Sequence, residues 1–499
     1  MIIVGLGGLQ GDGACAILRD GELLAALEES KINRGAHSGV PEAALAECVR
    51  LAGIARDAVD CVAVVRPVDP ALHFSLRELF PRAEIAVVEH HLAHAASAFF
   101  ASPFEDATVL TLDHTGDFSC GARWRGHGNE LQLDREWQYP DSPAWLYSAV
   151  TELLGFKARA DEHKLQWLSA SGDDRFLPAF REIVADAGMP AALREKLAAV
   201  AGSPVPAALA PHVAHGLQRA VEERVLAMAG EGENLCVAGG LFFNALLVEF
   251  LERSGRWKNV FVQPAAGNTG TALGGALYVW HQRQRHSKRG DTSLLLGPSY
   301  SPEEIKKVLE NCKLRFRYLR SVDELLTLAV AMLGDRKIVA WMQGRMEFGP
   351  RALGNRSILA SPLDPYSTEN LNVFIKHREP FRKFAASVPA ELANQYFDVG
   401  PNARNLATVG RVKPEHRKTF AAAILGEDIV RVHTVFEADN PMYHRLLHAA
   451  GKATGLPVVY NTSFNLFGDP LVSTPRDAVR SFYSSGIDAL FVGNFVVEK

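Results

Sequence analysis

The chain of 499 residues has few of the features that mark secreted, membrane or nucleic-acid-binding proteins. Its six cysteines are scattered, without a Cys-x-x-Cys pair or disulfide-like spacing, so we expect reduced thiols in a cytoplasmic protein. No apolar run is long enough to cross a bilayer, and the N-terminus lacks a basic leader. The formal net charge is -4 with mixed signs, which excludes a basic stripe. We therefore expect no nucleic-acid or membrane partner and a small-molecule ligand instead.

Apolar residues, by contrast, are plentiful, at 47% of the chain. A chain of this length and composition can bury substantial cores in two or more domains without disulfide support. Length and composition therefore indicate a large soluble enzyme.

The most informative motif combines two histidines with a later aspartate. His90 and His94 are one helical turn apart, so both imidazoles leave the same face of a helix, and Asp113 follows an apolar strand. Two imidazoles and a carboxylate bind a divalent metal and leave coordination positions open for a substrate oxygen. The alternative is that these histidines cap a helix or lie in a satisfied core. Imidazole and carboxylate ligands alone do not decide between iron, manganese and zinc.

The first half of the chain repeats one structural theme. A strand, a glycine-containing turn and a hairpin occur twice, about a hundred residues apart. Such duplication is typical of the actin and sugar-kinase fold, in which paired turns hold phosphates through backbone N–H groups. The strands of the first copy are expected at Met1–Gly8, Ala14–Leu18 and Glu22–Leu27, and those of the second at Thr108–Leu112, Ser119–Trp124 and Glu130–Leu133, with a turn at Asp113–Gly116.

A further element has the same character. A strand over Asn234–Ala238 is followed by Gly239 and Gly240 and by a helix expected over Phe242–Arg253, whose N-terminal amides could face a nucleotide. A loop of small residues, Pro264–Gly275, opens another helix and permits close backbone approach. The alternative for this loop is tight packing of a helix against the sheet.

A domain boundary is expected between residues 283 and 320. The run Arg283–Thr292 is polar and loop-like, and a new α/β segment begins near Val322. It opens with a helix over Asp323–Leu333 and a strand over Lys337–Met342, and the chain is expected to end with a strand over Ala489–Val497.

The loop Gln343–Ala360 follows that strand and holds three arginines, Arg345, Arg351 and Arg356. Planar guanidinium groups clamp phosphate or carboxylate oxygens in pairs, so this loop predicts an anion pocket. The run Lys376–Phe384 adds cations, and Asn461–Asn465 adds neutral donors after a strand. A surface salt-bridge network is the alternative for the lysine and arginine run.

These segments resemble the O-carbamoyltransferases that tailor antibiotics and nodulation factors, relatives of the hydrogenase-maturation and tRNA threonylcarbamoyl enzymes. The similarity runs nearly end to end and is most specific at His90–Phe99, Gln343–Ala360, Asn372–Val388 and Asn461–Val472. It implies an actin-like domain over residues 1–318, carrying a metal and a nucleotide, and a smaller YrdC-like domain over residues 319–499, binding carbamoyl phosphate with ATP.

The resemblance also implies a two-stage reaction. Carbamoyl phosphate and ATP give carbamoyl-adenylate in the second domain, and the carbamoyl group then passes to an acceptor hydroxyl in the first. The metal is expected to be Fe2+, with Mn2+ or Zn2+ as alternatives, and Mg2+ accompanies ATP. The implied metal ligands are His90, His94, Asp113 and Asn268; the catalytic residues are Asp12, Arg345 and Lys376; the residues for nucleotide and carbamoyl phosphate are Gly239, Gly240, Asn244, Lys164, Arg351, Arg356, Ser357, Arg378, Arg382, Asn461, Ser463 and Asn465.

Two positions depart from the family pattern. Gln10-Gly11-Asp12 stands where the family usually has Ser-His-Asp, and Asn268 stands where it usually has a metal-binding aspartate. A neutral amide oxygen binds a divalent cation more weakly than a carboxylate does. A non-catalytic relative that binds nucleotide or carbamoyl phosphate is therefore the alternative function. The acceptor is not identified, and the oligomeric state is open, with a homodimer as one possibility.

Overall fold

The computed structural model describes residues 1–35, 37–185, 190–202, 204–284, 293–466 and 468–499. The chain forms two compact units: unit 1 comprises Met1–Glu28 and His37–Thr292, and unit 2 comprises Glu29–Ala36 and Ser293–Lys499. The main division thus falls between Thr292 and Ser293, within the range 283–320 expected from the sequence and 26 residues before the limit at 318 that the family resemblance implied. A short early segment also belongs to unit 2. The polar run predicted as a linker lies mostly outside the described residues.

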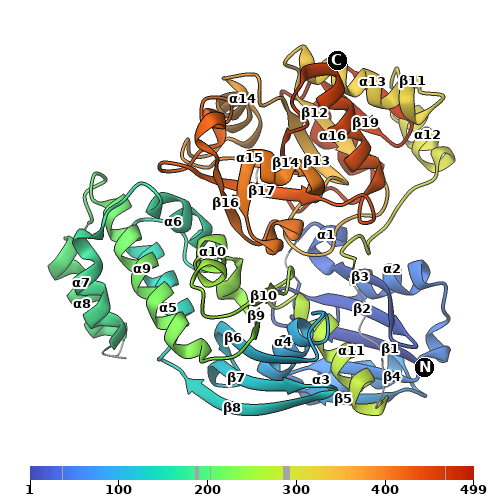
Figure 1. Cartoon of the computed structure of the whole chain (residues 1–499). Helices are drawn as coiled ribbons and strands as arrows, with labels where there is room; N and C mark the ends of the chain where they lie inside the picture. The colour runs from blue at the N-terminus through green and yellow to red at the C-terminus, as the bar shows by residue number, and fades with distance from the viewer. Residues whose placement is uncertain (36, 186–189, 203, 285–292, 467) are drawn as a thin grey trace. The chain divides into compact units, whose positions relative to one another are not determined.

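Unit 1 contains two five-stranded sheets with the same plan (Figure 1). In each, a central strand has an antiparallel hairpin on one side and two parallel strands on the other. This repeat confirms the predicted duplication. The first sheet has the order β3 (Glu22–Glu28), β2 (Ala14–Arg19), β1 (Ile2–Gly7), β4 (Cys61–Val65), β5 (Glu84–Val88), and the second β8 (Glu130–Gln138), β7 (Ser119–His127), β6 (Asp106–Gly116), β9 (Asn234–Ala238), β10 (Asn259–Val262).

Two helices pack against each other between these sheets. Helix α11 (Gly270–Arg283) lies on β1, β2 and β4, and helix α4 (His90–Phe99) lies on β6 and β9. A Cβ added at Gly274 would lie 1.8 Å from the Ala93 carbonyl oxygen, so the glycine permits the close approach of the two helices. Gly274 of the run Pro264–Gly275 therefore serves packing between two helices, whereas the alternative expected for this run was packing of a helix against the sheet.

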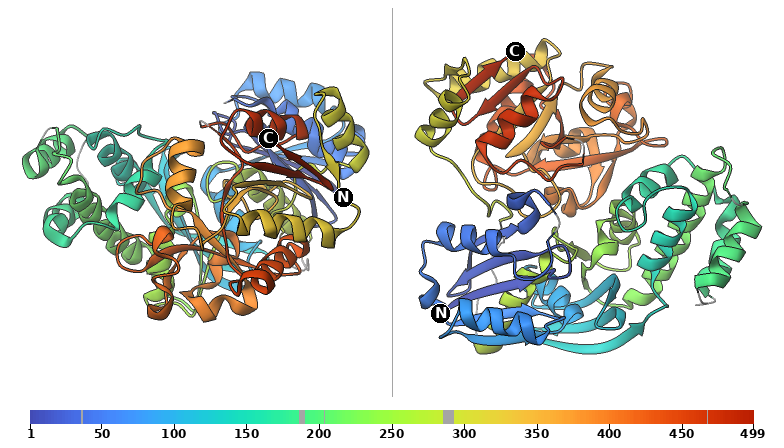
Figure 2. Two further views of the ribbon diagram at one scale, coloured as in Figure 1. Left: turned by 90° about the horizontal axis from the view of Figure 1, so that it is seen from above. Right: turned by 180° about the vertical axis from the view of Figure 1, so that it is seen from behind.

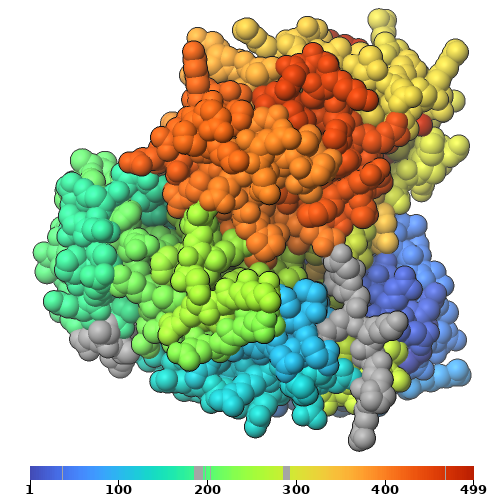
Figure 3. All heavy atoms as spheres, in the orientation of Figure 1, coloured from blue at the N-terminus to red at the C-terminus, as the bar shows by residue number. Residues whose placement is uncertain are grey.

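Helix α2 lies on β2 and β3 of the first sheet, and α5 and α9 lie over β6 of the second (Figures 1 and 2). Helices α6, α7 and α9 form a helical layer that reaches the molecular surface (Figure 3). The other helices of unit 1 are α2 (Glu42–Ala52), α3 (Pro70–Leu79), α5 (Pro143–Leu153), α6 (Glu162–Ser169), α7 (Leu177–Ala185), α8 (Pro190–Ala201), α9 (Ala210–Ala229) and α10 (Ala245–Arg253).

Unit 2 is built on one mixed sheet of ten strands. Along β12, Ala340 and Met342 join one apolar core, and Trp341 between them joins the core on the other face. The strand order is β11 (Arg317–Tyr318), β20 (Phe495–Glu498), β19 (Ala489–Val492), β12 (Val339–Met342), β13 (Arg356–Ala360), β18 (Val459–Ser463), β14 (Ala385–Pro389), β17 (Ile429–Val435), β16 (Val409–Val412), β15 (Phe397–Val399).

Helices lie on both faces of this sheet, with α12 and α17 on one face and α13 and α16 on the other. Among the described residues, no helix is long and apolar enough to span a membrane. The helices of unit 2 are α1 (Glu29–Asn33), α12 (Pro302–Asn311), α13 (Val322–Gly334), α14 (Ser367–Asn370), α15 (Ala393–Tyr396), α16 (Pro441–Thr454) and α17 (Pro475–Tyr483).

Three local boundaries differ from the sequence expectation. Strand β6 continues through the turn predicted at Asp113–Gly116, and the chain reverses at Asp117 and Phe118, which both have positive φ. A 3-10 turn (Gly240–Phe243) precedes α10, which begins at Ala245. The predicted last strand is a hairpin of β19 and β20, because Gly493 takes the left-handed conformation that a tight turn requires.

Candidate functional site

Helix α4 and strand β6 bring the three predicted metal ligands of unit 1 together. The Nε2 atoms of His90 and His94 are 3.1 Å apart, and each lies 3.2 Å from Oδ2 of Asp113. His94 is fully buried, and the side chains of His90 and Asp113 are 11% and 13% exposed. The i, i+4 spacing on one helix face therefore produces the convergence that the sequence predicted.

The surroundings of this triad favour the protonation states in which Asp113 and His94 can bind a metal ion. Burial by itself would raise the pKa of Asp113, but hydrogen bonds from both imidazoles outweigh it and hold that pKa well below its ordinary value. Burial lowers the pKa of His94, against the opposing effect of Asp113. An ionised carboxylate beside the neutral imidazole of His94 is the protonation state in which these two groups bind a divalent cation.

The backbone is shaped around the triad. A Cβ added at Gly116 would lie 2.1 Å from the ring of His90, so this position accepts glycine alone. The carboxylate of Asp117 accepts a hydrogen bond from the His90 backbone N–H at 3.0 Å and so secures the start of α4. The neighbouring His91 faces away from the triad, because its ring nitrogens contact Thr111 Oγ1 and the Ser119 carbonyl.

Asp12 and Asn268 lie at the same site. The Asn268 amide nitrogen donates to Asp12 Oδ2 at 3.4 Å, while its buried Oδ1 atom has no hydrogen-bond partner among the described residues. A buried oxygen of this kind is a ready cation ligand. The donor set of the triad, with this oxygen beside it, fits a divalent metal.

A cavity of about 360 Å³ opens over the triad within unit 1. Four of the residues singled out from the sequence, Asp12, Asp113, Gly240 and Asn268, line it. The adjoining residue Gly239 has a φ of 103°, and its N–H is bonded to the Ala266 carbonyl at 2.7 Å. The cavity is large enough for a small polar ligand.

Asn244 also lines this cavity, but its amide makes several internal contacts. Its Oδ1 atom caps α10 by accepting the Leu247 N–H at 3.0 Å, and its Nδ2 atom donates to Gln218 at 2.8 Å. The structure therefore gives Asn244 a part in positioning the cavity wall.

Lys164 is not among the residues that line the cavity. Its ammonium pairs with Asp161 at 3.2 Å, and the adjacent His163 and Glu162 line the cavity instead. Sequence reasoning also missed Tyr147 and Arg159 of the lining. The charged residues around the start of α6 were the available signal for this part of the lining. The sequence pattern could not show which side chains face the cavity.

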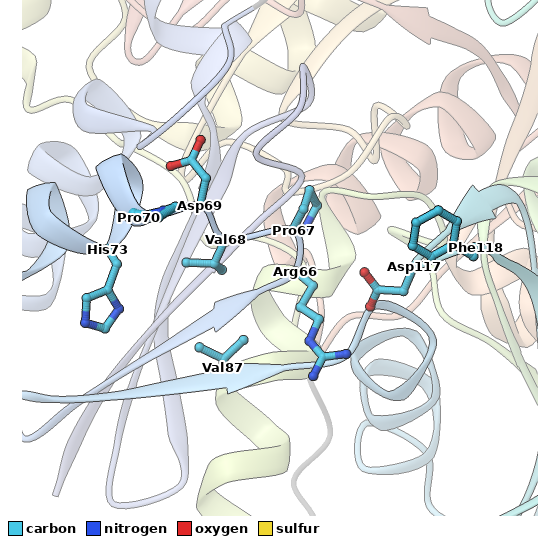
Figure 4. Close-up of a pocket in the computed structure, with 9 residues that line it drawn as sticks. All are labelled: Arg66, Pro67, Val68, Asp69, Pro70, His73, Val87, Asp117 and Phe118. Carbon is cyan, nitrogen blue, oxygen red and sulfur yellow. The ribbon is translucent and has the colours of Figure 1, made fainter.

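A second cavity of unit 1, of about 570 Å³, lies near the start of α4 (Figure 4). Asp117 and Phe118 stand at one side of it, and Pro70 and His73 at the other. Phe118 is 90% exposed in a left-handed conformation. Since Asp117 also holds the first residue of α4, this opening adjoins the helix that carries the two histidines.

Five cations of unit 2 act electrostatically on one another. Burial and the charge of Arg382 lower the pKa of Arg351 to about 10 and that of Arg378 to about 9. Burial, with Arg378 and Arg382, holds the pKa of Lys376 well below its ordinary value. Burial, together with the charges of Arg351, Arg378 and Arg382, holds the pKa of Arg431 well below its ordinary value. We call Arg351, Lys376, Arg378, Arg382 and Arg431 the cation cluster.

Specific contacts position the cation cluster. The Lys376 ammonium donates to the Ser463 carbonyl at 2.5 Å and to Asn465 Oδ1 at 2.7 Å. The Arg378 guanidinium donates to Asn372 Oδ1 at 2.7 Å and stacks 4.3 Å from the centre of the Phe384 ring. Arg431 was missed from sequence, although an arginine in the buried strand Ile429–Val435 was the signal.

Two of the predicted loop arginines contact backbone carbonyls. Arg356 is fully buried and donates to the carbonyls of Gln343 and Pro298 at 2.7 and 2.9 Å. Arg345 donates to the carbonyls of Leu296 and Gly297. These bonds hold the loop in shape, and the contacts described do not join either residue to the cation cluster.

The predicted neutral residues lie on adjacent strands beside Lys376. Ser357 on β13 pairs with Ser463 on β18, and the Ser463 hydroxyl donates to Asn465 Oδ1 at 2.8 Å. Asn461 donates to the Ala352 carbonyl at 3.1 Å. Ser357 Oγ and Asn461 Oδ1 are buried without a hydrogen-bond partner among the described residues, so both are available to a ligand.

Comparison with known proteins identifies the family to which a chain with these features belongs. Residues 70–277 match the family model for the carbamoyltransferase N-terminus, and residues 330–499 match that for the carbamoyltransferase C-terminus. An uncharacterized protein of Synechocystis is 32% identical over 100% of this chain and 96% of its own length. The nodulation protein NolNO of Sinorhizobium fredii is 31% identical over 98% of this chain and 79% of its own length.

One relative is named for the reaction that it catalyses. The 3'-hydroxymethylcephem-O-carbamoyltransferase of Amycolatopsis lactamdurans is 29% identical over 81% of this chain and 79% of its own length. Among solved structures, component A of the (R)-2-hydroxyglutaryl-CoA dehydratase of Acidaminococcus fermentans covers 56% of this chain and 98% of its own, at 17% identity and a TM-score of 0.40. That likeness is too low to assign a fold by itself.

Proposed function

Because the chain belongs to the carbamoyltransferase family, we propose that it is an ATP-dependent enzyme that carbamoylates a hydroxyl of a small molecule. The acceptor class rests on the relatives, one of which is named for O-carbamoylation of a hydroxymethyl group. The two stages of the reaction are divided between the two units, with unit 2 as a YrdC-like adenylating unit.

Carbamoyl-adenylate forms in unit 2. Water releases phosphate from carbamoyl phosphate, and an oxygen of the resulting carbamate attacks the α-phosphorus of ATP. The bond from that phosphorus to the bridging oxygen breaks, and pyrophosphate leaves with Mg2+. Both substrates are polyanions, so the protein must neutralise their charge. Once the one water of the first step has reacted, the pocket must also keep protons from carbamate, because protonated carbamate decomposes to CO2 and ammonia.

The cation cluster is the observation that carries this proposal. Burial first, and then the like charges of neighbouring arginines, destabilise the charged forms of these residues, as the lowered pKa values of Lys376 and Arg378 reflect. A bound polyanion reverses this effect, because each cation then gains an opposite charge at close range. Ser357 and Asn461, with their unpartnered oxygens, would accept hydrogen bonds from the carbamoyl amide or the ribose.

Transfer to the acceptor takes place in the cavity of unit 1. The acceptor oxygen attacks the carbonyl carbon of carbamoyl-adenylate, AMP leaves, and Asp12 at the cavity mouth takes the hydroxyl proton. Gly240, which lines the cavity, would leave room for the nucleotide, whereas a Cβ at Gly239 would meet the backbone of Leu112 instead. His90, His94, Asp113 and Asn268 would hold a divalent cation, Fe2+ in our proposal, which supplies Lewis-acid polarisation when bound.

The alternative is a non-catalytic relative that binds nucleotide or carbamoyl phosphate. Gly11 and Asn268, in place of the family histidine and aspartate, favour this alternative. The cation cluster favours the enzyme, because a protein without catalytic function has no need to hold like charges together.

Pyrophosphate release in the absence of acceptor tests the proposal. Purified protein with ATP, Mg2+ and carbamoyl phosphate should release pyrophosphate and phosphate in equal amounts. The variants Lys376→Met and Arg378→Gln should lower the rate at least about a hundredfold, because each removes a charge that stabilises the transition state.

Lys383→Gln is the matched control. It removes a partly buried lysine from the same segment, one that is not part of the cation cluster, and should keep the wild-type rate within about twofold. Absence of pyrophosphate release with Fe2+ or Mn2+ added, together with binding of both substrates, would establish the non-catalytic alternative.

A further inference from the structure

A second cluster of imidazole and carboxylate groups lies in unit 2. His444 and His448 are one turn apart on α16, and both point their Nε2 atoms at Glu391 on the 3-10 turn η5 (Ala390–Leu392). The distances to Glu391 Oε1 are 3.0 Å from His444 and 2.7 Å from His448. The three donor atoms lie within 4.8 Å of one another.

The donor set matches that of an open transition-metal site. Two imidazole nitrogens and one carboxylate oxygen form three-ligand zinc sites, in which the fourth position holds water or a ligand. The ring centres of His444 and His448 are 4.6 Å apart, so both rings face the same point without clashing. Little movement is needed to admit an ion between atoms that already converge.

A cavity of about 310 Å³ adjoins the cluster and gives the fourth position room. Glu391 and His444 line it, together with Glu437 and Phe436. A second carboxylate, Glu437, thus faces the same cavity as two of the ligands. An ion held here would be reached from solvent, since Glu391 is 50% exposed and His448 39% exposed.

The cluster is distinct from the cation cluster. Strands β14 and β17 are parallel, with Ala385 paired to Arg431 at one end and Pro389 paired to Val435 at the other. The cation cluster includes Arg431 at the first end, whereas Glu391 follows Pro389 at the second. The two groups therefore lie at opposite ends of the same pair of strands.

We propose that Glu391, His444 and His448 bind a divalent transition metal of the zinc class. The ion joins η5 to the first two turns of α16. It is a positioning site rather than a catalytic one, and it is independent of the proposed carbamoyl transfer.

An ion that holds helix α16 in place would also affect the loop that carries Arg351. Asn440, which caps this helix, donates to the Leu353 carbonyl and to Asn355 Oδ1 at 3.1 and 2.9 Å. Both acceptors belong to the loop that also carries Arg351. Fixing α16 to η5 therefore stabilises the support of the arginine-bearing loop.

Zinc titration of the full chain tests this site. The other candidate metal site is first removed with His94→Gln, so that one high-affinity equivalent of Zn2+ remains to be measured by calorimetry. Adding His448→Gln should weaken this binding at least about tenfold, because one of three ligands is lost. Zn2+ should raise the melting temperature of the His94→Gln protein by a few degrees, and this rise should disappear with His448→Gln.

The control is His127→Gln, which removes another exposed histidine that pairs with a single carboxylate, Asp106. It should leave zinc binding unchanged in the same background. His448 is exposed enough that its replacement leaves the fold intact, which the unliganded melting temperature checks. Equal zinc affinity with and without His448→Gln would overturn the proposal and leave the cluster as an ion pair.

Discussion

Glu222 is a buried carboxyl within a polar network beside the cavity of unit 1. It accepts hydrogen bonds from Gln218 at 2.9 Å and from Arg219 at 2.7 Å, and Gln218 in turn contacts Asn244 and Tyr147. Burial nevertheless dominates and raises the pKa of Glu222 to about 7. The charged form of this residue is therefore unfavourable in the folded protein near neutral pH.

This raised pKa predicts a pH dependence of stability. The folded protein holds the Glu222 proton more tightly than the unfolded chain, so stability is highest near or below the ordinary glutamate pKa. It falls as pH rises towards 7, by about 3 kcal/mol in total. Glu222→Gln should remove this decline and raise the free energy of unfolding at pH 8 relative to wild type. Urea unfolding of both proteins at pH 5 and pH 8 measures it, and an equal decline in both would contradict the assignment.

At the scale of single residues, the sequence predicts the positions of some site residues and not of others. His90, His94 and Asp113 could be found because helical spacing and a strand end determine their positions locally. Arg351 and Arg356 look alike in the sequence, yet one joins the cation cluster and the other is buried against backbone carbonyls. That distinction depends on strand pairing across unit 2, which local patterns do not encode.

Among the elements, helix α1 is separated in sequence from the unit it belongs to. Its Lys31 is 6% exposed and donates to the carbonyls of Glu347 and Gly349 at 2.8 and 2.7 Å. The nearby Arg34 donates to the Leu471 carbonyl at 2.9 Å. A short early segment thus stabilises the loop that leads to Arg351, which composition and periodicity gave no reason to expect.

Lys31→Met should therefore destabilise this loop. The change leaves two carbonyls without their charged donor and should cost about 2–3 kcal/mol. We expect a melting temperature several degrees lower and weaker binding of carbamoyl phosphate, measured by differential scanning calorimetry and isothermal titration calorimetry. Lys258→Met, which removes an exposed lysine paired with Glu233, is the control and should change neither. An unaltered melting temperature with Lys31→Met would show that these carbonyls find other donors.

Across the whole molecule, the duplicated sheets of unit 1 were predictable because strand, turn and hairpin recur with local patterns. The ten-stranded sheet of unit 2 was not, because neighbours such as β13 and β18 are about a hundred residues apart in sequence. The assignment of adenylation to unit 2 and of carbamoyl transfer to unit 1 is a prediction from the family resemblance. The two compact units make this assignment testable.

The triad and the cation cluster belong to different compact units, so their functions should be separable by mutation. His94→Gln removes a metal ligand of unit 1 and should cost one equivalent of bound metal, while pyrophosphate release stays within about twofold of wild type. Lys376→Met should have the opposite result, with metal content retained and pyrophosphate release lost. Both readouts need no acceptor, so they can be measured on the same preparations. Loss of pyrophosphate release in His94→Gln would mean that adenylation itself requires unit 1, because no contact described within unit 2 depends on His94.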